Sequence, residues 1–184
     1  MLQDTYYSMQ SSSGPSEVTQ SSCRLPPLQE NMFLQGMRDS GLGIYLQQLV
    51  IRRDQPLHTA SFRRAFDELV ARHAALRCSF LFDDAVRIAL RHHARASVPI
   101  TVEDLSVLAV RDQEQRFEAF LKEDRSKGFD PGDTPLMRVA VFQLGENQHR
   151  IVWTSHHAIM DGRSRVVALQ ELFALEAAFL NKRG

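Results

Sequence analysis

The sequence has little of several features that would place a protein in a special class. Cysteine occurs only twice in 184 residues, as Cys23 and Cys78, without the spacing typical of metal ligands. This favours a buried thiol at 78 and a tail thiol at 23 over a disulfide. No apolar run approaches the roughly 20 residues of a membrane span, and the N-terminus lacks the basic and apolar segments of a secretory signal. These absences predict a cytoplasmic protein that is not held in a membrane.

A surplus of either charge is also absent. Lys and Arg number 22 and balance 22 Asp and Glu, so the formal net charge is zero. Binding to nucleic acid or to an anionic membrane regardless of sequence needs a basic surplus, and we expect neither partner. The 43% hydrophobic content is that of an ordinary globular protein, and the length is sufficient for one domain with a core.

The chain divides into a polar leader and one folded unit. Residues 1–24 are rich in serine and cannot bury enough apolar surface to offset the entropy of ordering, so we expect a flexible leader or linker there. Residues 25–184 should form the folded unit.

Apolar periodicity predicts an alternation of helices and strands in this unit. Helices are expected within 25–37, over 57–75, from about 110 to Gly128, and over 164–181. Strands are expected over 44–51, 76–82, 86–90, 98–102, 136–144 and 149–155. The last helix should pack through Val166, Leu169, Phe173 and Leu180. This order has no regular βαβ repeat and no Gly-rich phosphate loop, and it predicts an α/β sandwich built on a mixed sheet.

The residues with catalytic chemistry are concentrated near the C-terminus, in Ser-His-His-Ala-Ile-Met-Asp-Gly-Arg-Ser at 155–164. His156, His157, Asp161 and Gly162 lie where a strand ends and a helix begins. The positive pole of a helix N-terminus favours a neutral imidazole, and only one of two adjacent histidines can face a cleft if the backbone stays extended. The pattern indicates proton removal from an attacking amine, hydroxyl or thiol during acyl transfer.

Several interpretations of these residues remain open. Asp161 could orient His157, cap the helix, or pair with a buried arginine such as Arg77. Arg77 lies in an apolar run, where an unpaired charge would cost several kcal/mol. Gly162 would allow the backbone to approach a substrate closely. The two histidines could be packing residues instead, whereas a metal site lacks a third ligand at suitable spacing.

This motif resembles that of the condensation domains of nonribosomal peptide synthetases, which belong to the chloramphenicol-acetyltransferase-like superfamily. Three further segments are similar to family elements and occur in the family's order: Leu25–Met32, Arg72–Phe80 and Phe129–Arg138. Two residues depart from the family pattern, Ala74 where glutamate is usual and Cys78 where threonine is usual.

The resemblance implies a role for each residue of the motif. His157 would be the catalytic or substrate-positioning histidine and His156 would be structural. Asp161 would pair with Arg77, and Gly162 would line the acceptor side. The implied reaction forms amide bonds between acyl or aminoacyl thioesters in nonribosomal peptide or hybrid polyketide biosynthesis. The substrates would be attached to the phosphopantetheine arms of carrier proteins, and the chain itself would bind no cofactor or metal directly.

The resemblance covers only the N-terminal lobe of such a domain, one half of a chloramphenicol-acetyltransferase-like fold. We therefore expect the lobe alone to be inactive. Its partners would be carrier proteins and either a C-terminal lobe, neighbouring megasynthase domains or a second copy in a homodimer. Two alternatives stay open: a non-catalytic scaffold or docking lobe in a megasynthase, and an acyltransferase that uses an alcohol acceptor.

Overall fold

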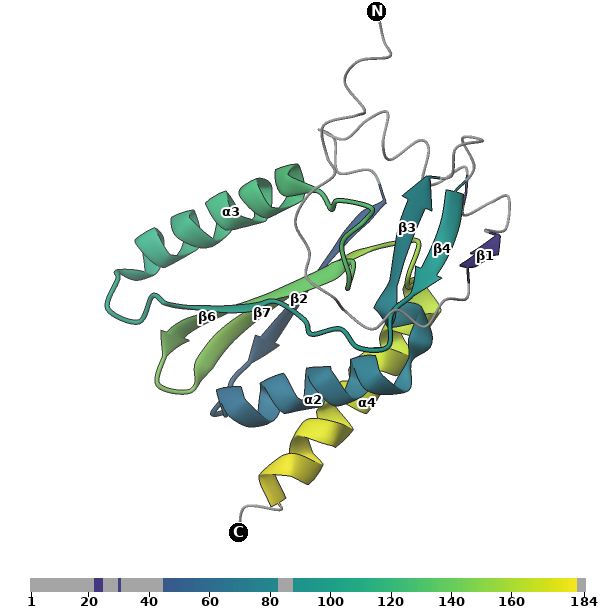
Figure 1. Ribbon diagram of the computed structural model, residues 1–184. Helices are drawn as coiled ribbons and strands as arrows, with labels where there is room; N and C mark the ends of the chain where they lie inside the picture. The colour runs from purple at the N-terminus through teal and green to yellow at the C-terminus, as the bar shows by residue number, and fades with distance from the viewer. Residues whose placement is uncertain (1–21, 25–29, 31–44, 83–87, 182–184) are drawn as a thin grey trace, which may run out of the picture.

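The computed structural model describes residues 22–24, 30, 45–82 and 88–181 (Figure 1). Its elements are β1 (Ser22–Arg24), β2 (Leu46–Arg53), α2 (Thr59–Arg72), the 3-10 helix η1 (Ala74–Arg77), β3 (Cys78–Phe82), β4 (Ile88–His92), β5 (Ile100–Asp104), α3 (Val110–Lys127), β6 (Met137–Gly145), β7 (Gln148–His156) and α4 (Gly162–Asn181). The helix predicted within 25–37 lies outside the described residues except for Glu30. The remaining predicted elements are all present, in the predicted order.

A four-stranded sheet with the order β2-β7-β6-β5 forms the centre of the molecule. β2, β7 and β6 pair in antiparallel fashion, whereas the edge strand β5 runs parallel to β6 and reaches it through α3. The sheet is therefore mixed, as the sequence predicts. Helix α3 lies on one side of this sheet, and α2 and α4 lie on the other (Figure 1). A second, antiparallel sheet has the order β1-β4-β3.

The alternation of side chains along β7 supplies a core to each face of the central sheet. Trp153 faces α2, where its ring meets Phe66 edge to face with centroids 5.2 Å apart. Its neighbour Val152 points to the other face and packs in the cluster that contains Phe117 of α3 and Phe142 of β6. Because strand residues alternate between faces, β7 is buried on both sides. A site at its end is thus held on a rigid support.

Helix α2 forms because its apolar residues recur at the spacing of one helical face. The residues of this face are each at most 1% exposed: Phe62, Ala65, Phe66, Leu69 and Val70. The helix ends at Arg72, earlier than the predicted residue 75, and the tighter η1 follows it. The strand predicted from Leu76 accordingly begins at Cys78, whose thiol is buried as predicted.

The predicted packing face of α4 is only partly right, because Leu169 packs against the core but is not among the fully buried residues of the helix. The buried apolar residues of this helix are Ala168, Leu172 and Leu175, whereas Val166 is 55% exposed. Apolar side chains surround α4, so their spacing does not select one face, and contact with α2 decides the outcome. The face of α4 that turns to the core also carries Glu176, which is buried and accepts two hydrogen bonds from Arg53 at 2.7 and 2.9 Å.

The boundary of the predicted leader also needs correction. Ser22–Arg24 forms strand β1, which pairs with β4 in the register Ser22↔Arg91 to Arg24↔Ala89. Structure therefore begins before residue 25, while residues 1–21 lie outside the described part. Of the helices that the structure describes, none combines the length and the apolar composition needed to cross a bilayer.

One buried carboxylate joins α3 to the sheet. Asp124 is 4% exposed and accepts hydrogen bonds from Arg138 Nε at 2.5 Å, Thr154 Oγ1 at 2.7 Å and Gln48 Nε2 at 2.7 Å. Burial by itself would raise the pKa of Asp124, but these three hydrogen bonds outweigh it and hold the pKa below its ordinary value. α3 is thus fixed to β2, β6 and β7 through a single side chain.

Candidate functional site

The histidine motif occupies the turn that links β7 to α4, and backbone hydrogen bonds hold this turn on both sides. His156 N donates to Leu136 O at 3.0 Å, and His157 N donates to Tyr45 O at 2.7 Å. Tyr45 has a φ of 66°, a conformation that costs a non-glycine residue roughly 1–3 kcal/mol. That conformation places the Tyr45 carbonyl against His157, so the residue before β2 helps to fix the backbone of the motif.

The His157 ring is half-buried, and one of its nitrogens is engaged by the protein. Nδ1 lies 2.8 Å from Gln47 Nε2 and 3.3 Å from Met160 O. Within the part of the chain that the structure describes, Nε2 makes no hydrogen bond. Nε2 is therefore the nitrogen that the described residues leave for a substrate.

The His156 ring turns toward the protein instead. Its Nδ1 accepts a hydrogen bond from Ala158 N at 3.2 Å, which shapes the turn. Burial, with a smaller contribution from His157, lowers the pKa of His156 to about 4. The ring is thus neutral near pH 7, as expected for a group that loses its hydration.

Asp161 caps the helix that follows the turn. Its Oδ1 accepts a hydrogen bond from Ser164 N at 2.7 Å, and its carbonyl accepts one from Arg165 N at 3.0 Å. The hydrogen bond from Ser164 is the main reason why the pKa of Asp161 lies below its ordinary value. Of the three interpretations open in the sequence, capping is the one that this geometry displays.

The expected ion pair between Arg77 and Asp161 does not form among the described residues. The Arg77 guanidinium donates to three backbone carbonyls instead, Val70 and Ala71 at 2.6 Å and His93 at 3.1 Å. η1 folds Arg77 back onto the C-terminal end of α2, where carbonyl groups lack helical partners. Arg77 is only partly buried, and these carbonyls satisfy its guanidinium without a carboxylate, while the start of α4 engages Asp161.

Gly162 begins α4 and is exposed. A Cβ added there would meet no atom of the described structure within 4 Å. Packing within this part of the chain thus gives no reason for a glycine, and its role on the acceptor side stays a prediction.

Two residues that the sequence did not single out complete the site. Gln47 of β2 contacts His157, and Arg165 NH1 of α4 donates to Gln47 Oε1 at 2.7 Å. The register Gln47↔Ser155 sets Gln47 diagonally opposite His157. The only sequence signal was a polar pair, Gln47-Gln48, inside an otherwise apolar strand pattern.

A hollow of about 180 Å³ borders the motif turn. Ala158 and Ile159 form part of its wall, together with Cys78 and His92 from β3 and β4. Cys78 Sγ lies 3.1 Å from His92 Nδ1 and 3.2 Å from Ala74 O. Cys78, which stands where threonine is usual, therefore lies in the wall beside the motif and has no hydrogen bond to His157 in the described part of the chain. No group of three His, Cys, Asp or Glu side chains in the described ranges could hold a metal ion.

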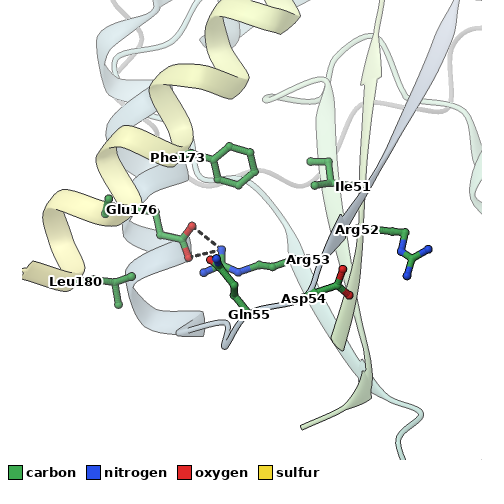
Figure 2. A pocket seen from close by; sticks show the side chains of 9 residues that line it. Ile51, Arg52, Arg53, Asp54, Gln55, Phe173, Glu176 and Leu180 are labelled. Carbon is green, nitrogen blue, oxygen red and sulfur yellow. Dashed lines mark hydrogen bonds and ion pairs between the residues drawn. The ribbon is translucent and has the colours of Figure 1, made fainter. Parts of the chain in front are cut away.

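A second hollow, of about 520 Å³, lies at the other end of β2. Figure 2 shows Arg53 from β2 and Glu176 from α4 facing each other there, beside Phe173 and Leu180. Gln47 and Arg53 are six residues apart on one strand, a distance of roughly 20 Å. Arg53 and Glu176 form an ion pair with each other. This ion pair links β2 to α4, and the hollow beside it is separate from the motif.

The comparisons with known proteins agree on one family. The condensation domain family matches residues 19–183. The chain is 32% identical over 151 residues to bacitracin synthase 1 of Bacillus licheniformis, an alignment that covers 82% of this chain and 3% of that protein. It is 30% identical over 154 residues to tyrocidine synthase 3 of Brevibacillus parabrevis, with coverages of 84% and 2%.

A solved structure gives the same result for the fold. The starter condensation domain of rhizomide synthetase superposes with a TM-score of 0.80 at 19% identity, covering 89% of this chain and 39% of that chain. The chain thus spans a few per cent of its curated relatives' length and about two fifths of the solved domain. The fold corresponds to one lobe.

Proposed function

The chain belongs to the condensation domain family, and from that premise we propose that it forms one wall of a site for amide-bond synthesis. The acceptor amine attacks the carbonyl carbon of a donor thioester, the C–S bond breaks, and the amine proton ends on the leaving thiol. Donor and acceptor are carried on the phosphopantetheine arms of carrier proteins, in the cytoplasm. The protein itself binds no cofactor directly in this reaction.

One observation supports this proposal most directly: at the junction of β7 and α4, none of the described residues hydrogen-bonds to Nε2 of His157. A histidine so placed can receive the amine proton or hold the reacting groups in line. An α-amine with a pKa of about 8 is partly neutral near pH 7, so positioning alone could suffice. His156 and Asp161 shape the turn and the helix start around it.

The lobe by itself supplies only one side of this site. The solved condensation domains that it matches are more than twice as long, and the remaining wall is the task of a second lobe. The isolated chain is therefore inactive in this proposal. Two copies could also pair through the same face, and sedimentation of the purified chain would reveal such a homodimer.

The experiment joins this lobe to a condensation-domain second lobe and supplies carrier-bound donor and acceptor. Intact mass spectrometry then identifies the product on the acceptor carrier. An amide supports the proposal. An ester formed only with a hydroxyl acceptor would support an acyltransferase that uses alcohols. A folded assembly that binds carriers and transfers nothing would support a non-catalytic docking lobe.

A further inference from the structure

His157 has one nitrogen whose partners decide where its proton lies. A neutral imidazole carries one N–H, and the other nitrogen accepts. Nδ1 faces two groups of opposite kind, the Gln47 amide at 2.8 Å and the Met160 carbonyl at 3.3 Å. A donor at Gln47 requires Nδ1 to be bare, whereas the carbonyl at Met160 requires Nδ1 to carry the proton. The orientation of the Gln47 amide therefore selects the tautomer.

Arg165 fixes that orientation. A guanidinium has donors only, so the group 2.7 Å from Arg165 NH1 must be the carbonyl oxygen of Gln47. The NH₂ end of the same amide then points at His157. A proton on Nδ1 would bring two donors within 2.8 Å of each other, and the longer contact to Met160 O would compensate poorly.

We propose that Gln47, oriented by Arg165, is a positioning residue that keeps the proton of neutral His157 on Nε2. In this state, Nε2 is a hydrogen-bond donor and has no lone pair to accept a proton. If the proposed function holds, this N–H of His157 donates to the acyl oxygen of the thioester, where negative charge develops as the amine attacks. The amine proton then passes to the leaving sulfur without residing on His157.

The register of the sheet makes this arrangement a stable feature. Gln47 lies within a continuous antiparallel pairing of eight residues between β2 and β7. Arg165 lies one turn into α4, whose start Asp161 caps. Sheet and helix therefore meet at the Gln47 amide, and both ends of that amide are engaged.

The test reads the tautomer directly in the isolated chain. Long-range ¹H–¹⁵N spectra of ¹⁵N-histidine-labelled protein distinguish a protonated ring nitrogen from a bare one, and His157→Gln assigns the signal. In the wild-type chain above pH 7.5, Nε2 should carry the proton. Gln47→Glu keeps the side-chain size but offers only acceptors, so the proton should move to Nδ1. The ratio of the two tautomers should change by roughly tenfold or more.

Gln148→Glu is the matched control, because it makes the same chemical change at an exposed position at the opposite end of β7. It should leave the tautomer unchanged. Gln47→Leu provides a second variant if Gln47→Glu folds poorly, as judged by circular dichroism. It removes the donor and leaves Met160 O, so the proton should again move to Nδ1.

A wild-type proton on Nδ1, or a tautomer that neither Gln47 variant changes, would overturn the inference. Because no substrate is present, either result would leave the proposed amide synthesis untouched. Conversely, a failure of amide synthesis would not alter the measured tautomer.

Discussion

At the scale of single residues, the two adjacent histidines differ in what surrounds their rings. None of the described residues hydrogen-bonds to Nε2 of His157, whereas Nδ1 of His156 accepts a hydrogen bond from the backbone of its own turn. Burial lowers the pKa of His156, so the free energy of unfolding should depend on pH. This can be measured without a substrate.

The stability of the chain should fall in mild acid because of His156. Its folded pKa of about 4 lies below the ordinary value of 6.5, so the unfolded state binds more protons between these pH values. The free energy of unfolding should drop by about 2 kcal/mol from pH 7 to pH 5 through this group. Urea denaturation at both pH values measures it.

His156→Gln is the comparison for this prediction, since glutamine can offer a carbonyl oxygen to Ala158 N and does not titrate. Its unfolding free energy should depend less on pH by the same amount. Identical pH dependence in the two proteins would show that His156 is not the group responsible.

Some residues of the site could be predicted from the sequence, and others could not. His156, His157, Asp161 and Gly162 could be selected because they form a contiguous motif with a recognisable order. Gln47 is 110 positions from His157, and its contact depends on the register of β2 against β7. Sequence periodicity shows that two strands exist, but it does not reveal which residues of the two strands lie opposite each other.

At the scale of secondary-structure elements, two substitutions of Asp161 test whether it caps α4 or forms an ion pair. Asp161→Ala should lower the free energy of unfolding, because it removes the acceptor for Ser164 N. Asp161→Asn should lower it much less, since asparagine caps as well as aspartate does. Chemical denaturation of both variants measures the difference.

Arg77 provides the control for this element. Arg77→Met removes the donor to three carbonyls and should destabilise the protein on its own account. Its effect should add to that of Asp161→Ala, because the two residues are not in contact in the structure. A coupling energy well above about 0.5 kcal/mol in this double-mutant cycle would restore the ion pair that the sequence predicts.

The attachment of α3 should depend on Asp124 far more than on charges at its surface. Asp124→Ala leaves Arg138 without its carboxylate in a buried setting, and should cost roughly 3–5 kcal/mol. Glu114 also pairs with an arginine of the sheet, Arg150, but its side chain is 48% exposed. Glu114→Ala should therefore cost less than about 1 kcal/mol. Equal losses of unfolding free energy in the two variants would contradict this role of Asp124.

The elements themselves were mostly predictable, and the errors have physical causes. α2 and α3 carry apolar stripes that a helical period identifies, so their positions were found. α4 is apolar on several sides, so its packing face was only partly predictable: Leu169 packs against the core as expected, whereas Val166 is exposed. Arg77 was expected to need a carboxylate, but the backbone carbonyls at the end of α2 satisfy it equally well.

At the scale of the whole molecule, the structure is one lobe whose motif lies at the end of a doubly covered sheet. The isolated chain should give no detectable condensation with carrier-bound donor and acceptor, because a second lobe is needed to enclose the thioester. Product analysis by mass spectrometry checks this. Turnover by the isolated chain that His157→Ala abolishes would show that one lobe, or a homodimer of it, is sufficient.

We propose above all that acyl transfer requires His157 once a second lobe completes the site. The most direct measurement is the rate of amide formation in an assembly of this lobe with a second lobe, for the wild-type protein and for His157→Ala. Gln148→Glu serves as the folded control. The rate should fall roughly 100-fold or more in His157→Ala, which removes the donor to the acyl oxygen, and stay unchanged in Gln148→Glu. An unchanged rate in a folded His157→Ala assembly would contradict the claim.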